Sequence, residues 1–383
     1  MEIEAWFLSD GATGKRGLLR ATVELGPPAP DELVAEPLYG SWEGNMGHAL
    51  ERRPIDICHF RGEDKVVIGN AGVLRVVACG AAVSRFREGD VALLFSGCEP
   101  DAHGYPTRIL GYDARGAMGC LATRIRIRET NLILIPPETK YSLARWAAFS
   151  LRYITAWSNW SLAYRTYRLL VSPEQDAAPN VWGWGGGTTL GVVDLARRNG
   201  ARAVMLSGND ERLQVIDSLG ITGLDRRQFG ALQYDEKRFA ADAEQRRSYI
   251  RAESAFLACV QEMTGGRGVQ IFVDNIGGPV IRATQRALSR EGIITTCGWK
   301  EGMQISYLRA VACIGRQQHI NTHYATHVEG EQAVAYAERH GWLPPIHNER
   351  IYSFDEIPQL AEDFAANRAD LFPLYRVHGG ELP

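Results

Sequence analysis

One short segment, VWGWGGGTTLG at 181–191, constrains the fold of this chain more than any other. An apolar stretch typical of a buried strand leads into it, and the apolar spacing after it predicts a helix that ends at Gly200. A second apolar strand is predicted at 203–206. Glycine allows a tight turn and a close approach of the backbone to phosphate, while the start of a helix offers free amides to an anion. The segment therefore predicts the dinucleotide-binding turn of a Rossmann domain, with contacts from Gly183, Gly185, Gly186, Gly187 and Thr188.

The turn departs from the usual glycine pattern at one position. If Gly183 and Gly186 are the first two glycines, the third is replaced by Thr189, where helix and strand normally pack most closely. We expect either a helix that stands slightly farther from the sheet or a hydrogen bond from the Thr189 side chain to a neighbouring group. In both cases Thr189 belongs to the predicted cofactor site.

The tip of the second strand bears on the choice of cofactor. An Asp or Glu there would accept hydrogen bonds from the ribose hydroxyls and repel a 2′-phosphate. The chain instead has Ser207, Gly208 and Asn209, with Arg212 one turn into the next helix. Because no carboxylate stands at the strand tip, we expect NADPH to be preferred over NADH, with Ser207 and Arg212 in the cofactor site.

The distribution of strands and helices predicts two domains. Up to about residue 150 the chain shows short strands separated by Gly and Pro, which favours an antiparallel, barrel-like unit. From Val181 onward strands alternate with helices, as in a parallel sheet wound with helices. The expected boundaries are 1–160 for the first part of the barrel domain, 161–315 for the Rossmann domain and 316–383 for the return to the barrel domain. The charged segment 226–253 is predicted to be a surface excursion or an interface.

Composition narrows the class of protein. The 383 residues are 45% hydrophobic and 23% charged, which is typical of a globular chain, and the net charge of −3 gives no reason to expect nucleic acid as a partner. No run is long enough to span a membrane, and the first residues lack the layout of a signal peptide. The seven cysteines show no C-x-x-C spacing, so we expect free thiols in the cytoplasm. One local exception is the alternating set Arg124, Arg126 and Arg128, expected to be a solvated strand face or, alternatively, an anion-binding one.

Four segments in order resemble the medium-chain dehydrogenase/reductase superfamily. They are AAVSRFREGDVALLF (81–95), YITAW (153–157), the glycine-rich turn, and FVDNIGGPVIRATQRALSREGIITTCG (272–298). The resemblance covers nearly the whole chain. It implies an α/β chain with a GroES-like β-barrel catalytic domain plus a Rossmann doubly wound parallel sheet, an active-site cleft between them, and a homodimer. It also implies further cofactor-site residues, namely Thr155, Asn275, Cys297, Gly298 and Trp299.

Zinc-dependent alcohol dehydrogenases of that superfamily carry a cysteine, then Gly-His-Glu, then a cysteine-rich lobe. Here VIGNAG (67–72) has Asn70 where the histidine would stand, and no cysteine cluster surrounds Cys98. A zinc ion needs three or four convergent ligands, so we expect no metal.

The chain resembles in particular the crotonyl-CoA carboxylase/reductase branch and related enoyl-thioester reductases. The supporting segments are ILGYDARGAMGCLA (109–122), LDRRQF (224–229) and HINTHYATH (319–327). By position, the resemblance implies that Tyr112 and Asp113 correspond to the residue pair lining the carbon dioxide pocket, and His323 to its histidine. Asn45 lies near the position of its asparagine. Glu43 and Tyr153 are further catalytic candidates.

These features together predict an NADPH-dependent, zinc-independent reductase that adds hydride to an activated C=C bond, of an enoyl thioester or an enone, in specialised metabolism. Negative charge developing on the carbonyl oxygen must be stabilised by hydrogen-bond donors before the α-carbon takes a proton. The alternatives are a reductive carboxylase of an enoyl-CoA, a quinone reductase, a reductive cyclase of a polyenyl ketone, and a non-catalytic NADPH-binding protein.

Overall fold

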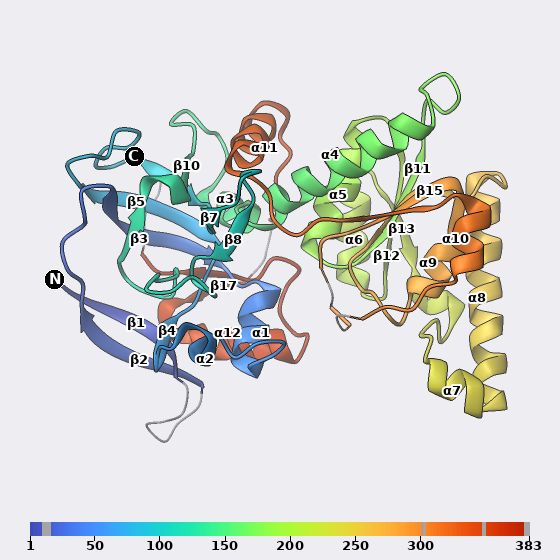
Figure 1. Ribbon diagram of the computed structural model, residues 1–383, viewed down its shortest axis with the longest axis horizontal. Coiled ribbons are helices and arrows are strands. Elements are labelled where there is room, and N and C mark those ends of the chain that lie inside the picture. Colours follow the sequence, from blue (N-terminus) through green and yellow to red (C-terminus); the bar gives the residue numbers. More distant parts are fainter. Residues whose placement is uncertain (10–16, 299, 302–303, 347–349, 379–383) are drawn as a thin grey trace. The chain divides into compact units, whose positions relative to one another are not determined.

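The computed structural model describes residues 1–9, 17–298, 300–301, 304–346 and 350–378 (Figure 1). The chain forms two compact units, unit 1 comprising Met1–Ile154 with Tyr324–Pro383, and unit 2 comprising Thr155–His323. None of the helices in the described part of the chain is long and apolar enough to cross a membrane.

The limits of the units differ from the domain boundaries expected after residues 160 and 315. The first limit falls inside one uninterrupted helix, α4 (Arg152–Leu170), where the sequence offers no break. The second falls later because β16 (Gln318–Asn321) pairs with the parallel sheet of unit 2. A short, exposed edge strand carries little apolar pattern, so its pairing with the sheet was not predictable from sequence.

Unit 2 is built on one parallel sheet of six strands. The order β13-β12-β11-β14-β15-β16 is that of a doubly wound dinucleotide-binding sheet. The central strands are buried on both faces, which is why their sequences are continuously apolar rather than alternating. The strands are β11 (Asn180–Trp184), β12 (Arg202–Ser207), β13 (Thr222–Asp225), β14 (Val269–Asp274), β15 (Leu288–Thr296) and β16. The helices after α4 are α5 (Gly187–Arg198), α6 (Asp210–Ser218), α7 (Glu236–Ala241), α8 (Ala243–Thr264), α9 (Ile281–Ala287) and α10 (Arg309–Gly315).

Different helices pack on the two faces of this sheet. On one face Val193 of α5 lies against Gly183 and Val273, where the missing glycine side chain lets the helix approach. On the other face Phe256 of α8 is fully buried against Trp182 and Trp184. The sheet is therefore covered on both sides, and its functional groups emerge at its edges.

The expectation that 226–253 is a surface excursion is wrong for part of the segment. Phe229 and Leu232 are buried in the same apolar cluster as Phe256, and Tyr249 and Ala252 lie on the buried side of α8. The segment is rich in charge because α7 and the outer side of α8 face solvent, while its sparse apolar residues occur at helical spacing and cover the sheet.

Unit 1 is a set of mostly antiparallel strands joined by short helices. Its main sheet has the order β10-β6-β5-β3-β18-β17, with β9 also paired to β3, and separate small sheets have the orders β2-β1-β4 and β7-β8. The strands are β1 (Glu2–Ser9), β2 (Gly17–Glu24), β3 (Glu32–Ser41), β4 (Lys65–Val67), β5 (Gly72–Cys79), β6 (Val91–Leu94), β7 (Gly97–Pro100), β8 (Pro106–Ile109), β9 (Ile125–Arg128), β10 (Leu132–Leu134), β17 (Ile351–Ser353) and β18 (Leu374–Arg376). The helices are α1 (Gly44–Glu51), α2 (Ile57–Arg61), α3 (Leu143–Phe149), α11 (His327–His340) and α12 (Ile357–Ala365). The predicted barrel-like arrangement is confirmed, and residues from both stretches of unit 1 share one core.

Candidate active site

The glycine-rich turn lies at the carboxyl edge of the parallel sheet, directly after β11. Gly185 has φ of +153°, and a Cβ there would lie 2.1 Å from the Thr189 Oγ1 atom, so no side chain fits. Gly186 is the N-cap of α5 and has no atom within 4 Å of where its Cβ would be. The turn is thus closed toward the helix and open on the side of Gly186.

The first backbone amides of α5 have no capping side chain. The N-cap residue of α5 is Gly186, which has no side chain to accept a hydrogen bond from them. Gly187, Thr188 and Thr189 begin the helix, and uncapped amides at this position favour an anion such as a pyrophosphate. Because the space beside Gly186 is open, the turn fits the phosphates of a dinucleotide.

Thr189 replaces the usual third glycine. Its side chain forms a hydrogen bond with a neighbouring group, which is the second of the two expected outcomes. Its Oγ1 accepts a hydrogen bond from Asn275 Nδ2 at 2.9 Å. The Oδ1 of Asn275 in turn accepts from the backbone N–H of Cys297 at 3.0 Å and from the Thr296 hydroxyl at 3.3 Å. The network joins the start of α5 to the ends of β14 and β15. Both polar atoms of the Asn275 carboxamide therefore have hydrogen-bond partners within the protein.

A group of cations surrounds the tip of β12. Arg226 packs on Gly208, where a Cβ would lie 2.8 Å from the Arg226 Nε atom. Burial, with the charges of Arg212 and Arg226, lowers the pKa of Lys300. The predicted residues Ser207 and Arg212 therefore stand beside Arg226 and Lys300, which the sequence interpretation missed.

Arg227 differs from its neighbour Arg226 because carboxylates neutralise it. It forms ion pairs with Asp210 and with Asp225, the latter at 2.8 Å. Among the described residues no ion pair within 4 Å is formed by Arg226. Both arginines belong to the LDRRQF segment that the sequence analysis noted. The sequence alone does not show which of the two is paired with carboxylates.

His323 is placed at the same edge of the sheet. Its Nδ1 lies 3.2 Å from the carbonyl oxygen of Cys297, at the end of β15, and the ring is exposed. Cys297 and Gly298 follow β15 directly, and Thr155 is half-buried in α4. Trp299 lies outside the described residues. Unit 2 thus gathers the predicted histidine with most of the predicted cofactor residues.

In unit 1, Tyr112 and Asp113 lie in a turn that follows β8. Asp113 Oδ1 accepts a hydrogen bond from the Ile109 N–H at 2.6 Å, so this carboxylate closes its own turn. Arg61, almost fully buried, donates to the carbonyl oxygens of Tyr112 (3.3 Å) and Ala117 (3.0 Å) and fixes the turn. Burial, with the charge of Asp113, raises the pKa of Tyr112 to about 12.

The charges of this turn also act on Tyr324, a residue that the sequence analysis did not single out. Burial raises the pKa of Tyr324 to about 12, with smaller contributions from Asp113 and Tyr112. Tyr324 follows His323 directly in the sequence, and the sequence analysis selected only the histidine of this segment.

The other candidates of unit 1 are more buried. Glu43 is 4% exposed and its Oε2 pairs with Arg152 Nε at 3.1 Å; burial raises the pKa of Glu43, partly opposed by Arg152. Asn45 lies in the first turn of α1 and is half-buried. Tyr153 is fully buried among aromatic rings, with the centroid of Trp342 at 4.8 Å. Its environment is that of a core residue.

The arginines at 124, 126 and 128 behave as a strand face. Ile125 and Ile127 are buried between them, as the alternation predicts. Arg126 pairs with Glu32 at 2.9 Å and Arg128 with Asp31 at 3.5 Å. These carboxylate partners favour the solvated face over the anion-binding alternative.

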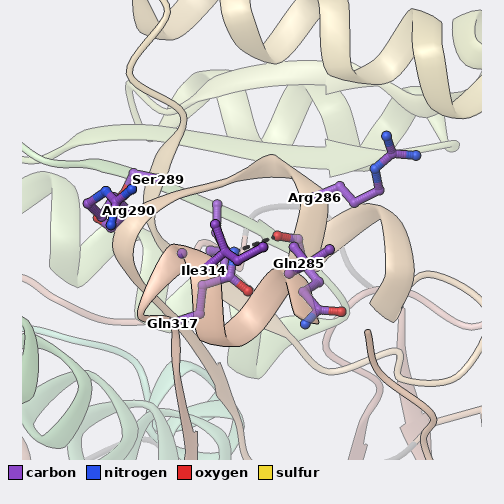
Figure 2. A pocket seen from close by; sticks show the side chains of 9 residues that line it. Gln285, Arg286, Ser289, Arg290, Ile314 and Gln317 are labelled. Carbon is purple, nitrogen blue, oxygen red and sulfur yellow. Dashed lines mark hydrogen bonds between the residues drawn. The ribbon is translucent and has the colours of Figure 1, made fainter. Parts of the chain in front are cut away.

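A surface cavity lies at the opposite edge of this sheet. Figure 2 shows this cavity, of about 290 Å³, between α10 and the start of β15, lined by Gln285, Arg290, Ile314 and Gln317. The start of β15 is at the amino edge of the parallel sheet, whereas ligands of such sheets bind at the carboxyl edge. In the described part of the chain no group of three or more His, Cys, Asp or Glu side chains is arranged to hold a metal ion.

Comparisons with known proteins point to one fold. No protein-family profile matches the chain. Crotonyl-CoA reductase of Streptomyces collinus is 22% identical over 209 residues, which are 52% of this chain and 44% of that protein, so the match spans less than half of that relative. The crotonyl-CoA carboxylase/reductase AntE, solved in complex with NADP, superposes with a TM-score of 0.79 at 20% identity, covering 99% of this chain and 96% of that one. The 2-octenoyl-CoA carboxylase reductase CinF, solved with NADP and 2-octenoyl-CoA, gives 0.78 at 20% identity over 98% and 87%.

The chain has the fold of these carboxylase/reductase structures, with a GroES-like unit and a Rossmann unit. The resemblance expected from the four sequence segments is thereby confirmed for the fold, including the GroES-like and Rossmann parts.

Gly185→Ala and Gly186→Ala test the geometry of the turn. Because a Cβ at Gly185 meets Thr189, we expect Gly185→Ala to lower the free energy of unfolding by about 1–3 kcal/mol. Gly186→Ala, with open space at its Cβ, should change it by less than about 0.5 kcal/mol. Urea denaturation followed by tryptophan fluorescence measures both. Equal stabilities of the two variants would contradict the described turn.

Proposed function

We propose that this chain is an NADPH-dependent, zinc-independent reductase that transfers hydride to an activated C=C bond of an enoyl thioester or enone. The observation that carries the proposal is the uncapped glycine-rich turn at the carboxyl edge of a Rossmann sheet. Support comes from the similarity, over nearly the whole chain, to carboxylase/reductases solved with NADP and, in one case, an enoyl-CoA. Asn70 at the position of a zinc-binding histidine supports the zinc-independent reading.

Different residues of unit 2 would bind different parts of the dinucleotide. The amides of Gly187 and Thr188 would hold the pyrophosphate, and Arg226, Lys300 and Arg212 would hold a 2′-phosphate. When bound, the reduced nicotinamide supplies a hydride. Because Thr189, Asn275 and the end of β15 are tied together, the sheet edge against which the ring would lie is preorganised.

Arg226→Ala and its neighbour Arg227→Ala test the 2′-phosphate assignment. A lost hydrogen bond to a charged group costs about 1.5–3 kcal/mol, so Arg226→Ala should raise the Kd for NADPH about 10- to 100-fold. Its Kd for NADH should change little. Arg227→Ala is the control, because Asp210 and Asp225 already neutralise that side chain. Fluorescence titration measures both cofactors, and tighter binding of NADH than NADPH by the unsubstituted chain would defeat the assignment.

The reaction itself is tested by NADPH oxidation over a panel of enoyl thioesters, enones and quinones. We expect turnover of an enoyl thioester or enone, with slower turnover of quinones. Binding of NADPH without turnover of any compound would instead support a non-catalytic binder. Bicarbonate added to the same assay, with mass analysis of the product, distinguishes simple reduction from reductive carboxylation. We expect the product without an added carboxyl group, because the carboxylate of Asp113 is occupied within its own turn.

We further propose that two copies of the chain associate through β16 and α10. β16 is the last strand of its sheet and has a neighbour on one side only, so its other side is open to pairing. None of the residues of α10 is buried, and Ile314 is 72% exposed. A cavity of about 540 Å³ is lined by residues of both elements, including Cys313 and His319. An apolar, exposed helix beside an open strand edge suits a second copy of the same surface.

Ile314→Glu tests this association. Charge at an apolar contact should convert a dimer to a monomer in size-exclusion chromatography with light scattering. Leu169→Glu is the control, since Leu169 is 85% exposed on α4 and outside the proposed surface. A monomeric unsubstituted chain, or a dimer that Ile314→Glu leaves intact, would refute it.

The compartment follows from the cysteines. All seven are free thiols; four of them are half-buried and Cys313 is exposed. Unpaired, accessible thiols favour a reducing compartment, and we place the protein in the cytoplasm.

A further inference from the structure

Six buried polar atoms without a hydrogen-bond partner among the described residues belong to one small region of unit 1. They come from the segment after β3, the start of α1, the segment before β5, and β18. The atoms are Trp42 Nε1, Glu43 Oε1, Asn45 Oδ1, Asn70 Nδ2, Asn70 Oδ1 and Tyr375 OH. Such groups are uncommon, since buried polar atoms are nearly always paired.

Strand pairing brings these side chains together. Gly40, near the end of β3, pairs with Gly72 of β5 on one side and Tyr375 of β18 on the other. The Ser41 N–H donates to the Ala71 carbonyl at 3.1 Å, so Trp42 and Asn70 are the next residues beyond this last cross-strand contact. The Tyr375 hydroxyl lies 3.1 Å from where a Cβ on Gly69 would be, beside Asn70. Burial raises the pKa of Tyr375, with smaller contributions from Cys120 and Glu43, in keeping with this grouping.

Asn70 is the most costly member of the group. It is 1% exposed, and neither atom of its carboxamide has a partner among the described residues. Leaving a buried polar group unpaired costs about 1–3 kcal/mol, so a leucine of similar size would suit the fold better. Asn131 shows the structural alternative in the same unit, because its Nδ2 donates to the carbonyls of Phe95 (3.0 Å) and Gly97 (2.7 Å). Asn131 stabilises the fold through these bonds, whereas the Asn70 carboxamide makes none with the described residues.

The chemistry of the group indicates what that partner is. Asn70 Nδ2, Trp42 Nε1 and the Tyr375 hydroxyl are donors, which suit an oxygen that accepts hydrogen bonds. The negative charge of Glu43 is offset by Arg152 at 3.1 Å, so the group does not repel an oxygen that becomes negative. The loop is joined to the Tyr112–Asp113 turn, since the Gly69 N–H donates to the Gly111 carbonyl at 3.2 Å. Tyr112 is half-buried, so the turn that adjoins the group is partly open to solvent.

We propose that the Asn70 carboxamide binds the carbonyl oxygen of the activated double-bond substrate and donates to it as it becomes an enolate. This assignment rests on the proposed reductase function. Hydride from NADPH forms the bond to the β-carbon, the C=C electron pair moves to the α-carbon–carbonyl unit, and the charge resides on the carbonyl oxygen. The Asn70 N–H lowers the energy of that charge and keeps its proton, while the α-carbon later takes one from an acid such as water. Asn70, which stands in the sequence where zinc-dependent relatives have a ligand histidine, would thus stabilise the oxyanion without a metal.

Asn70→Leu and Asn131→Leu separate this role from a structural one. Asn70→Leu removes two unpaired polar atoms, so its Tm should be equal to or above that of the unsubstituted chain. Its kcat/KM with the enoyl thioester should fall about 10²- to 10³-fold, as for loss of one oxyanion donor, with the Kd for NADPH unchanged. Asn131→Leu should lower the Tm, because it leaves the Phe95 and Gly97 carbonyls unpaired.

Each outcome bears on the assignment. A lower Tm for Asn70→Leu comparable to that of Asn131→Leu would overturn it, as would kcat/KM within threefold of the unsubstituted chain. Asn70→Asp, which replaces the donor by a negative charge, should be at least as inactive as Asn70→Leu and would overturn the assignment if active. Failure of the unsubstituted chain to oxidise NADPH with any substrate defeats the proposed function, whereas full activity of Asn70→Leu defeats only the role of Asn70.

Discussion

The hydrogen bond between Asn275 and Thr189 holds together the part of the chain on which the proposed chemistry depends. In a dinucleotide-binding turn the third glycine usually allows the helix and the sheet to touch. Here a threonine stands at that point, fully buried, and its methyl group fills the space that Gly183 leaves open. Its hydroxyl is fixed by Asn275, which also fixes the backbone at Cys297. The ends of three elements are therefore held together at the edge where a dinucleotide would lie. With threonine in place of the third glycine, the helix and the sheet remain in close contact.

The proposed binding of a 2′-phosphate depends on the distribution of charge around β12 and β13. Six ionic side chains lie at this corner, but they are paired unequally, because Arg227 pairs with both Asp210 and Asp225 while Arg226 packs on Gly208. The charge of Lys300 is disfavoured by burial and by the nearby arginines, so an incoming dianion would relieve the strain between like charges. A 2′-phosphate is such a group.

Sequence patterns predicted the features that depend on local order. The glycine-rich turn, the strands around it and the alternation of Ile125 and Ile127 with arginines all depend on neighbours in sequence, and the structure has them. The buried half of 226–253 was not predictable from charge, because four apolar side chains among many ionic ones suffice to cover the sheet. Arg226, Tyr324 and Tyr375 were missed since their importance comes from contacts across the fold. Asn70 was noticed only as the absence of a histidine, while its lack of partners is a property of three strands together.

The central claim is hydride transfer to the β-carbon of a conjugated C=C bond, and isotope labelling tests it most directly. The enoyl thioester or enone that the protein turns over fastest would be incubated with it and NADPH carrying deuterium at the transferable position of the nicotinamide, and the product analysed by mass spectrometry and NMR. The account predicts a saturated product with one deuterium, located on the β-carbon, and a solvent proton on the α-carbon. A product without deuterium, deuterium on the α-carbon, or no reduced product from this or any other enoyl thioester or enone, would contradict it.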